Sequence, residues 1–242
     1  KGPYGDCSIH FNLDEVKRNT LLFFKAIDFT EEVYQVILSR SGGKKKIDLE
    51  VSLDETPFPT SPENHLFFII LLSHRGVHID GLAPRFIGEF QKAIDYRGNL
   101  NDFRNQFYQH VLIAQDHEHY KISIHSGSDK FSVFPTMGEL AGEGLHLKTA
   151  GTSWLEAMRL IARMDPPLYR DMHRFALSSF KEASKHYSVT TNLDRIPKLE
   201  DLSDQKLPAL LDQDDARQLL HITYGFLLKA TSSVGKSLFK NR

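Results

Sequence analysis

The stretch Tyr120-Lys121-Ile122-Ser123-Ile124-His125 alternates apolar and polar side chains, and this alternation decides the expected fold. Successive side chains of an extended strand point to opposite faces of a sheet, so the apolar residues share one face and the polar residues share the other. The polar face carries every reactive group of the segment, and His125 stands at its carboxyl end. We therefore predict a strand at residues 120–125 whose polar face borders a reaction site.

The same alternation occurs in three further segments, which predicts strands at residues 47–54, 77–83 and 144–150. A fifth strand is expected at residues 188–192. An antiparallel sheet with one wet face gives the same alternation. However, a turn signal and then a helical pattern follow these strands, and that order indicates parallel strands joined by helices.

Helical periodicity accounts for most of the remaining sequence. Ser153 and Glu156 have the spacing of a capping box, which predicts a helix that begins there. The other predicted helices span residues 13–27, 30–39, 63–75, 99–117, 129–140, 167–186 and 214–230.

Parallel strands that are covered by helices turn their polar face toward a barrel axis or a crevice, and the sites of both architectures lie at the carboxyl ends of the strands. An open doubly wound sheet buries both faces, so its strands are continuous apolar runs. The alternation therefore favours a (β/α) TIM-type barrel, as a single α/β domain over residues 1–242. A closed barrel of this class needs eight strands, and about five candidates are found, so we expect the barrel to be incomplete or only partly represented.

The composition is that of an ordinary globular domain, with 40% hydrophobic residues, 25% charged residues and a formal net charge of -1. This balance gives no indication of a nucleic-acid or membrane partner. The longest apolar run, residues 66–72, is far too short to span a bilayer. Cys7 is the only cysteine, which predicts a reducing, cytoplasmic compartment. No secretory signal peptide is expected, and because the chain begins at Lys1 without an initiating Met, we expect it to be one part of a longer protein.

Two histidines, His125 and His146, lie on the polar faces of successive predicted strands. Neighbouring strands lie about 4.8 Å apart, a spacing at which two imidazoles can converge on one ion. Imidazole suits zinc, manganese, nickel or iron. The alternative is that each histidine is merely hydrogen-bonded within the sheet, and the sequence does not reveal a third ligand.

Basic residues near the same strand ends fit the binding of an acidic substrate. Lys121, Lys130 and Lys148 would place positive charge near a carboxylate or enolate oxygen, although solvated lysine is the ordinary alternative. The segment Ser126-Gly127-Ser128 precedes a predicted helix, where backbone N–H groups can seat an anion. We therefore expect Ser126 and the three lysines to contact substrate.

Two adjacent carboxylates, Asp54 and Glu55, stand at the end of the first predicted strand. A carboxylate near a metal and lysines can exchange protons with a sugar hydroxyl or a carbon acid. Strand phase alone favours Asp54 as the side chain that points inward. Either residue could equally be the partner of a salt bridge.

Several segments carry a family resemblance when they are taken together. The most extended are Lys121–Phe131, with the sequence KISIHSGSDKF, and His146–Thr152, with the sequence HLKTAGT. Others follow in register at Asp54–Thr56, Leu82–Phe86, Ile94–Tyr96 and Arg217–His221. This set resembles the tagaturonate epimerase family, bacterial enzymes of hexuronate breakdown. The resemblance spans nearly all of this chain but only the later half to two-thirds of the family's length.

The resemblance implies a barrel enzyme that uses a divalent metal to interconvert D-tagaturonate and D-fructuronate, with a small sugar acid as its partner. It implies that His125 and His146 are the metal ligands. It also implies substrate-holding roles for Lys121, Lys148 and Arg85.

For the acid or base, the matching motif favours Glu55 first and Asp54 second, with Asp95 as a third possibility. Asp80 departs from the family's motif. His221 matches but falls on a predicted helix, which allows a structural role. The family's amino-terminal region, which is expected to supply another ligand, has no counterpart in this chain.

Two other functions remain open: a different metal-dependent sugar isomerase on the same barrel, and a non-catalytic protein that binds sugar acids. In the implied reaction the inverted carbon lies beta to the ketone, so simple enolisation cannot acidify its C–H bond. We expect retro-aldol cleavage, rotation of the aldehyde and re-addition. A transient oxidation is the other route, but the sequence has no nucleotide-binding fingerprint.

Overall fold

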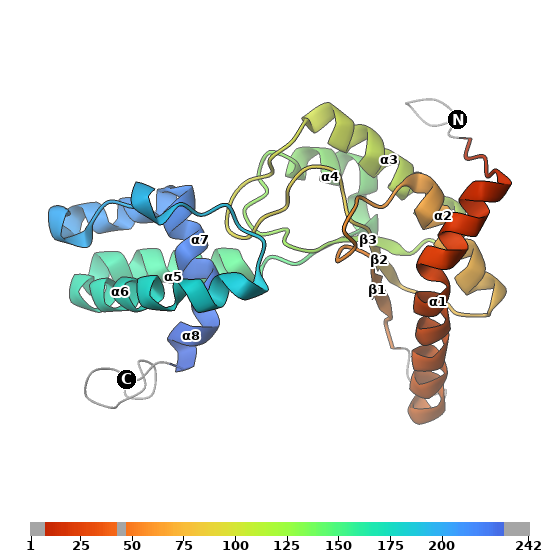
Figure 1. Cartoon of the computed structure of the whole chain (residues 1–242), viewed down its shortest axis with the longest axis horizontal. Coiled ribbons are helices and arrows are strands. Elements are labelled where there is room, and N and C mark those ends of the chain that lie inside the picture. The colour runs from red at the N-terminus through yellow and green to blue at the C-terminus, as the bar shows by residue number, and fades with distance from the viewer. Residues whose placement is uncertain (1–7, 43–46, 230–242) are drawn as a thin grey trace. The chain divides into compact units, whose positions relative to one another are not determined.

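The computed structural model describes residues 8–42 and 47–229, which form two compact units (Figure 1). Unit 1 consists of the residues up to Glu89 together with residues 97–125 and 132–147. Unit 2 consists of residues 90–96, 126–131 and the chain from Lys148 onward. Each unit is therefore assembled from segments that are separated in sequence.

Unit 1 contains a parallel sheet whose four strands follow one another in chain order. The strands are β1 (Glu50–Ser52), β2 (Gly81–Ala83), β3 (Lys121–Ile124) and β4 (Leu145–Leu147). Each lies within a predicted strand segment, although each is shorter than predicted, and the parallel pairing is confirmed. Sequential order is the order of a β/α barrel, whereas a doubly wound sheet reverses at a switch point. Four strands do not close a barrel, so the TIM-type barrel and the single barrel domain stay predictions.

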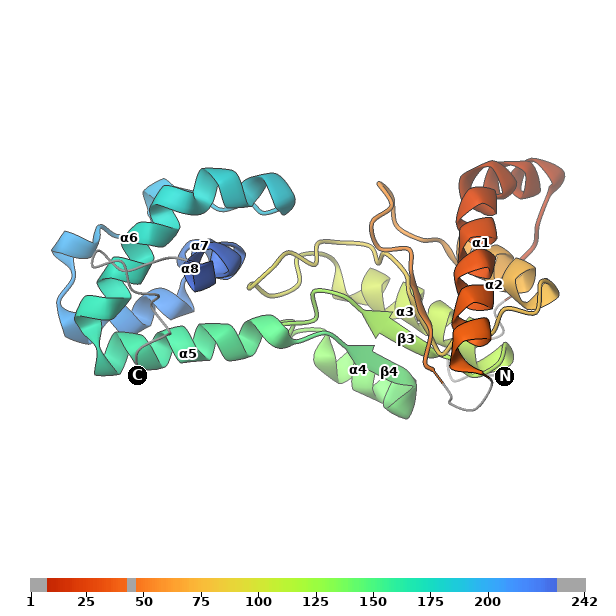
Figure 2. The same ribbon diagram turned by 90° about the horizontal axis from the view of Figure 1, so that it is seen from below.

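One helix precedes the first strand of unit 1 and three others connect the strands, and each packs on the next in sequence (Figures 1 and 2). They are α1 (Leu13–Ser41), α2 (Pro62–His74), α3 (Leu100–Asp116) and α4 (Phe134–Ala141). Ser61 and Asn99 begin α2 and α3 because their side-chain oxygens accept hydrogen bonds from N–H groups of the first turn. Ile122 and Ile124 are buried, as the alternation predicts, and Leu82 is also buried although it has the phase of the polar residues His78 and Asp80.

The prediction of two amino-terminal helices, at residues 13–27 and 30–39, is wrong because α1 is continuous. Thr30 was the expected start of the second helix. Its hydroxyl instead donates to the carbonyl of Ala26 at 2.7 Å, one turn earlier, so the side chain is satisfied inside the helix.

The predicted helix at residues 129–140 begins later than expected, at Phe134. Ser126 and Asp129 have φ angles of 56° and 63°, in the left-handed region, and a helix cannot propagate through such residues. The turn at residues 126–131 is held instead by hydrogen bonds of Lys130, described below.

Unit 2 is helical. Its helices are α5 (Ala150–Met164), α6 (Pro166–Ala183), α7 (Asp214–Ile222) and α8 (Tyr224–Lys229). Helix α6 packs against the other three (Figure 1). Short 3-10 helices lie at Ser184–His186, Leu193–Arg195, Leu199–Asp201 and Asp204–Asp212, and a fifth, Gly142–Gly144, precedes β4 in unit 1. The core of unit 2 is built around Leu155, Met158, Tyr169 and Leu219.

Two predicted helix boundaries in unit 2 are wrong. Helix α5 begins at Ala150, one turn before Ser153, because the hydroxyl of Ser128 accepts the first-turn N–H of Gly151 at 3.1 Å. The cap therefore comes from a residue that is distant in sequence. The predicted helix at residues 214–230 is divided at Thr223 into α7 and α8, and its last residue, Ala230, lies outside the described residues.

The fifth predicted strand, at residues 188–192, is also wrong: this segment forms no strand pairing in the structure. Its polar groups bond to side chains instead. Thr190 donates its N–H to Gln91 Oε1 at 2.9 Å, and the N–H of Asn192 donates to Asp215 Oδ1 at 2.7 Å. Side chains therefore satisfy the backbone that a neighbouring strand would otherwise pair.

Among the described residues, every helix is too short or too polar to span a lipid bilayer.

Candidate functional site

Two histidines and a glutamate meet on the polar face of the sheet in unit 1. His125, directly after β3, approaches Glu50 Oε1 of β1 with its Nε2 at 2.7 Å. His146 of β4 approaches the other carboxylate oxygen, Oε2, with its Nδ1 at 2.8 Å. Both oxygens of one carboxylate are therefore engaged, each by a different histidine, and three strands contribute to the contact.

Asp54 joins this group from the turn after β1. Its Oδ2 lies 3.1 Å from Nδ1 of His125, and its Oδ1 accepts a hydrogen bond from Ser52 Oγ at 2.6 Å. A carboxylate oxygen can only accept, so His125 must carry a proton on both ring nitrogens when both contacts form. We call Glu50, Asp54, His125 and His146 the strand-end cluster.

The sheet register explains how side chains from β1 reach those of β3 and β4. On the sheet, β2 lies between β1 and β3. Glu50 of β1 pairs with Gly81 of β2 and Ser52 pairs with Ala83, so the β2 residues on this face are glycine and alanine, the two smallest amino acids. A Cβ at Gly81 would lie 3.4 Å from Cγ of Glu50, so even an alanine side chain at this position would touch the Glu50 side chain. Small residues on β2 therefore leave room for the Glu50 side chain to cross it.

Burial of the strand-end cluster is graded. The side chains of His125 and Glu50 are 17% and 23% exposed, whereas that of His146 is 50% exposed. Beneath them, Ser123 is fully buried, and its hydroxyl lies 3.3 Å from Nδ1 of His146. The cluster therefore has a buried base and a rim that solvent or a ligand can reach.

The donor atoms of this cluster fit a divalent cation by type, since imidazole nitrogens and carboxylate oxygens are ligands of zinc, manganese, iron and nickel. These donor atoms do not surround a common point in the structure. Within residues 8–42 and 47–229, no group of three or more His, Cys, Asp or Glu side chains converges as a metal site. The histidine nitrogens face carboxylates instead. A cation would have to replace one of these hydrogen bonds.

Three other predicted residues of unit 1 lie on or after the strands: Glu55 follows β1, Arg85 follows β2, and Lys121 is the first residue of β3, at its amino end. Arg85 donates its backbone N–H to Thr60 Oγ1 at 2.9 Å, and its guanidinium donates to the carbonyl of Thr56. Glu55 and Lys121 have exposed side chains. The structure thus brings Asp54 to His125 and leaves Glu55 facing solvent, as strand phase predicts.

Two remaining carboxylates have backbone partners. Asp80, which precedes β2, accepts the N–H of Leu49 on its Oδ2 at 3.0 Å and so fixes the approach to β1. In unit 2, Asp95 accepts the N–H of Tyr96 at 2.7 Å. Both contacts are those of residues that shape the backbone.

In unit 2, Lys130 is fully buried and donates to three backbone carbonyls. The acceptors are Gln91, Ile94 and Ser128, at 2.8, 2.5 and 3.0 Å. Burial lowers the pKa of Lys130 to about 8, against the opposing effect of Asp129. Because all three ammonium protons have carbonyl acceptors, these contacts favour a role in shaping the turn.

The other predicted substrate residues of unit 2 are more accessible. Ser126 accepts a hydrogen bond from Lys92 Nζ at 2.5 Å, and Lys148 is exposed. His221 lies on α7, within the helix that the sequence predicts at residues 214–230. Burial, followed by the charge of Lys92, lowers the pKa of His221 to about 4.

A glycine in the same unit lies against His221. A Cβ on Gly151 would lie 2.1 Å from Nε2 of the imidazole, so the His221 side chain would have to shift to make room for it. Next to it, Asp129 is 5% exposed, and its Oδ1 lies 2.9 Å from the guanidinium of Arg217. The segments that resemble a family motif, residues 126–131, 146–152 and 217–221, therefore have tight packing requirements of their own.

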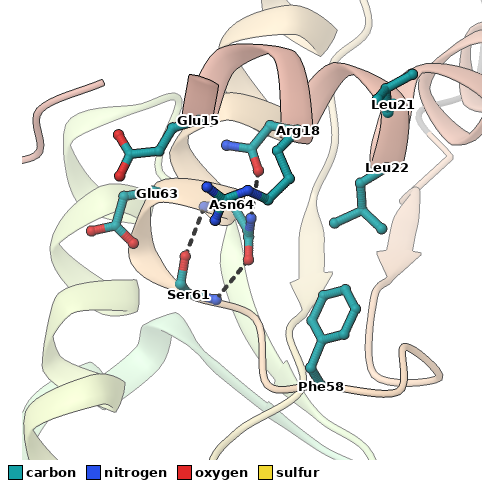
Figure 3. Close-up of a pocket in the computed structure, with 9 residues that line it drawn as sticks. Glu15, Arg18, Leu21, Leu22, Phe58, Ser61, Glu63 and Asn64 are labelled. Atoms are coloured by element: carbon teal, nitrogen blue, oxygen red, sulfur yellow. Dashed lines mark hydrogen bonds between the residues drawn. The ribbon is translucent and has the colours of Figure 1, made fainter. Parts of the chain in front are cut away.

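A cavity of about 650 Å³ lies elsewhere in unit 1, between α1 and the start of α2. Figure 3 shows Leu21, Leu22 and Phe58 on one side of it and the hydrogen-bonded Ser61 and Asn64 on the other. None of the predicted site residues lines it. We place the candidate site at the strand-end cluster, because titratable groups converge there and two of them, Asp54 and His125, follow the carboxyl ends of β1 and β3, the usual location in parallel sheets.

Glu50 is the site residue that the predictions missed. It stands in the first predicted strand, in the same phase as Asp54, so period-two counting places it on the reactive face. Its sequence position gave no sign that it would contact both histidines, because the strands that carry them are distant in sequence.

Comparisons with known proteins give a consistent result. The tagaturonate epimerase family model matches residues 4–242. A tagaturonate/fructuronate epimerase from Thermotoga maritima is 42% identical over 232 residues, which are 96% of this chain and 47% of that protein. The native crystal structure of a fructuronate-tagaturonate epimerase from Cohnella laeviribosi is 47% identical with a TM-score of 0.90, over 96% of this chain and 46% of that one. A glycerol complex of the same enzyme gives a TM-score of 0.91, again at 47% identity, over 97% of this chain and 47% of that one. The chain thus spans about half the length of the relatives it matches.

Proposed function

The chain belongs to the tagaturonate epimerase family, and we propose that its strand-end cluster takes part in interconverting D-tagaturonate and D-fructuronate. The observation that carries the proposal is the contact of Glu50 with both His125 and His146, while Asp54 contacts His125. Titratable groups gathered on one face of a parallel sheet, next to the carboxyl ends of β1 and β3, are suited to proton transfer and cation binding. A small sugar acid as partner and a cytoplasmic location are part of the same proposal.

We propose that His125 and His146 hold one divalent cation, with Glu50 as a further ligand. Two imidazoles and a carboxylate form a donor set that zinc, manganese, nickel and iron accept. A ligating imidazole nitrogen must be unprotonated, so loading would release a proton from this cluster. When bound, a divalent cation supplies Lewis-acid polarisation of substrate oxygens.

The proposed reaction is a retro-aldol cleavage followed by re-addition. A carboxylate removes the proton from the hydroxyl of the inverted carbon, the bond from this carbon to its neighbour beside the ketone breaks, and the electron pair of that bond forms an enediolate. The released aldehyde rotates, and the enediolate carbon adds to its opposite face. The carboxylic acid then returns its proton to the new alkoxide. Every bond that breaks is re-formed, so the route needs no oxidant.

We assign the proton transfer to Asp54 or Glu55. The motif favours Glu55, whereas the contact of Asp54 with His125 supports Asp54, because an N–H on Nδ1 of His125 can donate to the carboxylate that begins the reaction. Arg85 and Lys121 would hold the substrate carboxylate. The substrate-binding roles of Ser126, Lys130 and Lys148 in unit 2 stay predictions, and for Lys130 a positioning role is better supported by its three carbonyl partners.

The reaction route is tested with D-fructuronate in D₂O in the presence of zinc, manganese, nickel or iron salts. Retro-aldol cleavage predicts that the inverted carbon keeps its hydrogen and that an aldehyde trap captures a cleaved fragment. Turnover with no trapped fragment would contradict this route and favour oxidation at that carbon. A panel of other ketoses and uronates tests the substrate assignment, and faster turnover of another ketose would overturn it.

We further propose that turnover needs more of the family's polypeptide than these 242 residues, because the chain spans about half the length of its relatives. The 242-residue chain should bind metal weakly and show no epimerase activity, and a polypeptide of family length should restore both. Robust turnover by the 242 residues alone would contradict this. Uronate binding without turnover at family length and with metal would instead favour a non-catalytic binding protein.

A further inference from the structure

A chain of hydrogen bonds runs through the core of unit 1 and joins α2, α3 and the residue before β3. His65 of α2 contacts the hydroxyl of Tyr120 through Nε2 at 2.6 Å and His110 of α3 through Nδ1 at 2.8 Å. His110 in turn reaches the carbonyl of Thr60 through Nε2 at 3.1 Å. Both histidines are fully buried, and Tyr120 is 4% exposed. We call these four residues the buried histidine chain.

The direction of every hydrogen bond in this chain follows from its last acceptor. The carbonyl of Thr60 can only accept, so His110 carries its proton on Nε2 and, when neutral, accepts on Nδ1. His65 must then donate from Nδ1, which makes its Nε2 an acceptor for the hydroxyl of Tyr120. Burial supports the neutral forms, since it lowers the pKa of His110 to about 4 and that of His65 well below its usual value.

The chain ends where two loops of unit 1 are joined. Thr60, in the loop after β1, donates its N–H to the carbonyl of Arg85 at 2.8 Å and accepts the N–H of Arg85 on Oγ1 at 2.9 Å. Gln106 of α3 adds a second donor to the Thr60 carbonyl at 3.2 Å and accepts the N–H of Ile87 at 2.8 Å. Helix α3 therefore holds the loops after β1 and β2 together, and Thr60 is 2% exposed.

We propose that His110 is a positioning residue that fixes the backbone of Arg85 through Thr60, and thereby sets where the Arg85 guanidinium meets a substrate carboxylate. The contact between Arg85 and substrate rests on the proposed function, whereas the fixed position of the Arg85 backbone does not. The guanidinium donates to the carbonyl of Thr56, within the same joined loops. A buried, fully paired chain of this kind holds its members in one geometry.

Two substitutions at His110 separate this role from general packing. The amide nitrogen of glutamine lies the same number of bonds from Cα as imidazole Nε2, so His110→Gln keeps a donor for the Thr60 carbonyl and loses the acceptor for His65. The amide oxygen of asparagine corresponds to Nδ1, so His110→Asn keeps the acceptor and loses the donor. A third variant, Thr60→Val, keeps the side-chain shape and removes the acceptor for the N–H of Arg85.

The first measurement is amide hydrogen exchange of the whole chain. NMR monitors the exchange rate of the backbone N–H of Arg85 and, as a control for the fold, that of Ile122 in β3. We expect exchange at Arg85 to accelerate on the order of 10-fold in His110→Asn and Thr60→Val and to stay near the wild-type rate in His110→Gln. Equal acceleration in both His110 variants, or no change at Arg85 in Thr60→Val, would overturn the proposal. Thr60→Val keeps the test valid if His110→Asn does not fold.

The second measurement is the affinity for D-fructuronate in the same variants. His110→Asn and Thr60→Val should bind about 10-fold more weakly than wild type, and His110→Gln should bind nearly as well. Weakened binding in His110→Gln alone would contradict the proposed connection through Thr60. If the wild-type chain at family length and with metal does not bind D-fructuronate while the exchange pattern holds, the proposed function fails and the positioning of Arg85 stands.

Discussion

The two histidine groups of unit 1 stand in opposite surroundings. In the strand-end cluster, His125 and His146 face carboxylates and the rim is open, whereas His65 and His110 face neutral partners in a closed core. A histidine beside carboxylates at an open rim can gain or lose a proton or bind a cation. A histidine in the buried histidine chain cannot do so without breaking its hydrogen bonds. The same residue type therefore has a chemical role in one place and a positioning role in the other.

The largest effect should come from the carboxylate that transfers the proton in the strand-end cluster. Asp54→Asn is expected to lower turnover by about 10² to 10⁴ with little change in fold, and Glu55→Gln is its matched control on the adjacent residue. The measurement is kcat at family length with metal. If Glu55→Gln falls and Asp54→Asn stays near wild type, the family motif was the better guide and the contact with His125 is only an ion pair.

The next effect concerns acid stability and distinguishes the buried histidine chain from exposed histidines. Burial lowers the pKa of His110 in the folded state to about 4, while the unfolded side chain titrates near its ordinary value of about 6.5. The unfolded state thus binds more protons between these values, so this stability is fully present above about pH 6.5 and is lost as the pH falls toward about 4. For His110 the loss is on the order of 3 kcal/mol.

Denaturant unfolding of the wild type between pH 7 and pH 4 measures how steeply the free energy of unfolding falls with falling pH, which we call the pH slope. His65 contributes to the pH slope in the same direction, because burial and then the nearby His110 and His117 lower its pKa. The charged group that acts on Tyr120 is Glu118. His110→Gln should remove its own share of the slope, whereas His186→Gln, at an exposed position, should leave the slope unchanged. Equal slopes in all three proteins would contradict a neutral, buried pair.

A smaller effect is expected from filling the space across β2 in the strand-end cluster. Gly81→Ala should be tolerated, since its Cβ would lie 3.4 Å from Glu50, at ordinary contact distance. Gly81→Leu should push the Glu50 side chain away from His125 and His146 and weaken metal affinity by at least about 10- to 100-fold, the usual cost of disturbing even a group that only orients metal ligands. Titration of both variants with zinc tests this, and equal affinities would show that Glu50 does not depend on the gap.

Local pattern was sufficient for the elements that alternate regularly. Period-two counting located the four strands of the described sheet, and Asp54, which strand phase favours as the inward side chain, contacts His125. It failed where a distant side chain replaces a local signal. The hydroxyl of Ser128 begins α5 before Ser153, a partner that the local sequence around Ser153 does not contain.

The candidate site was only partly predictable for the same reason. His125 and His146 were found because each lies on the polar face of a strand, but Glu50 becomes significant only when the small Gly81 and Ala83 of β2 let it cross. His65 gave no local signal, because its role depends on partners from α3 and from the segment before β3.

The metal content of His125→Ala and His146→Ala tests the central claim most directly. Each variant is made in a polypeptide of family length, to avoid weak binding, and is dialysed with zinc, and bound metal is measured by elemental analysis. The control is His74→Ala, which replaces an exposed histidine of α2. We predict one bound cation in the wild type and in His74→Ala, and a marked loss in both variants of the strand-end cluster. Unchanged metal content in both of these variants would contradict the assignment of His125 and His146 as the metal ligands.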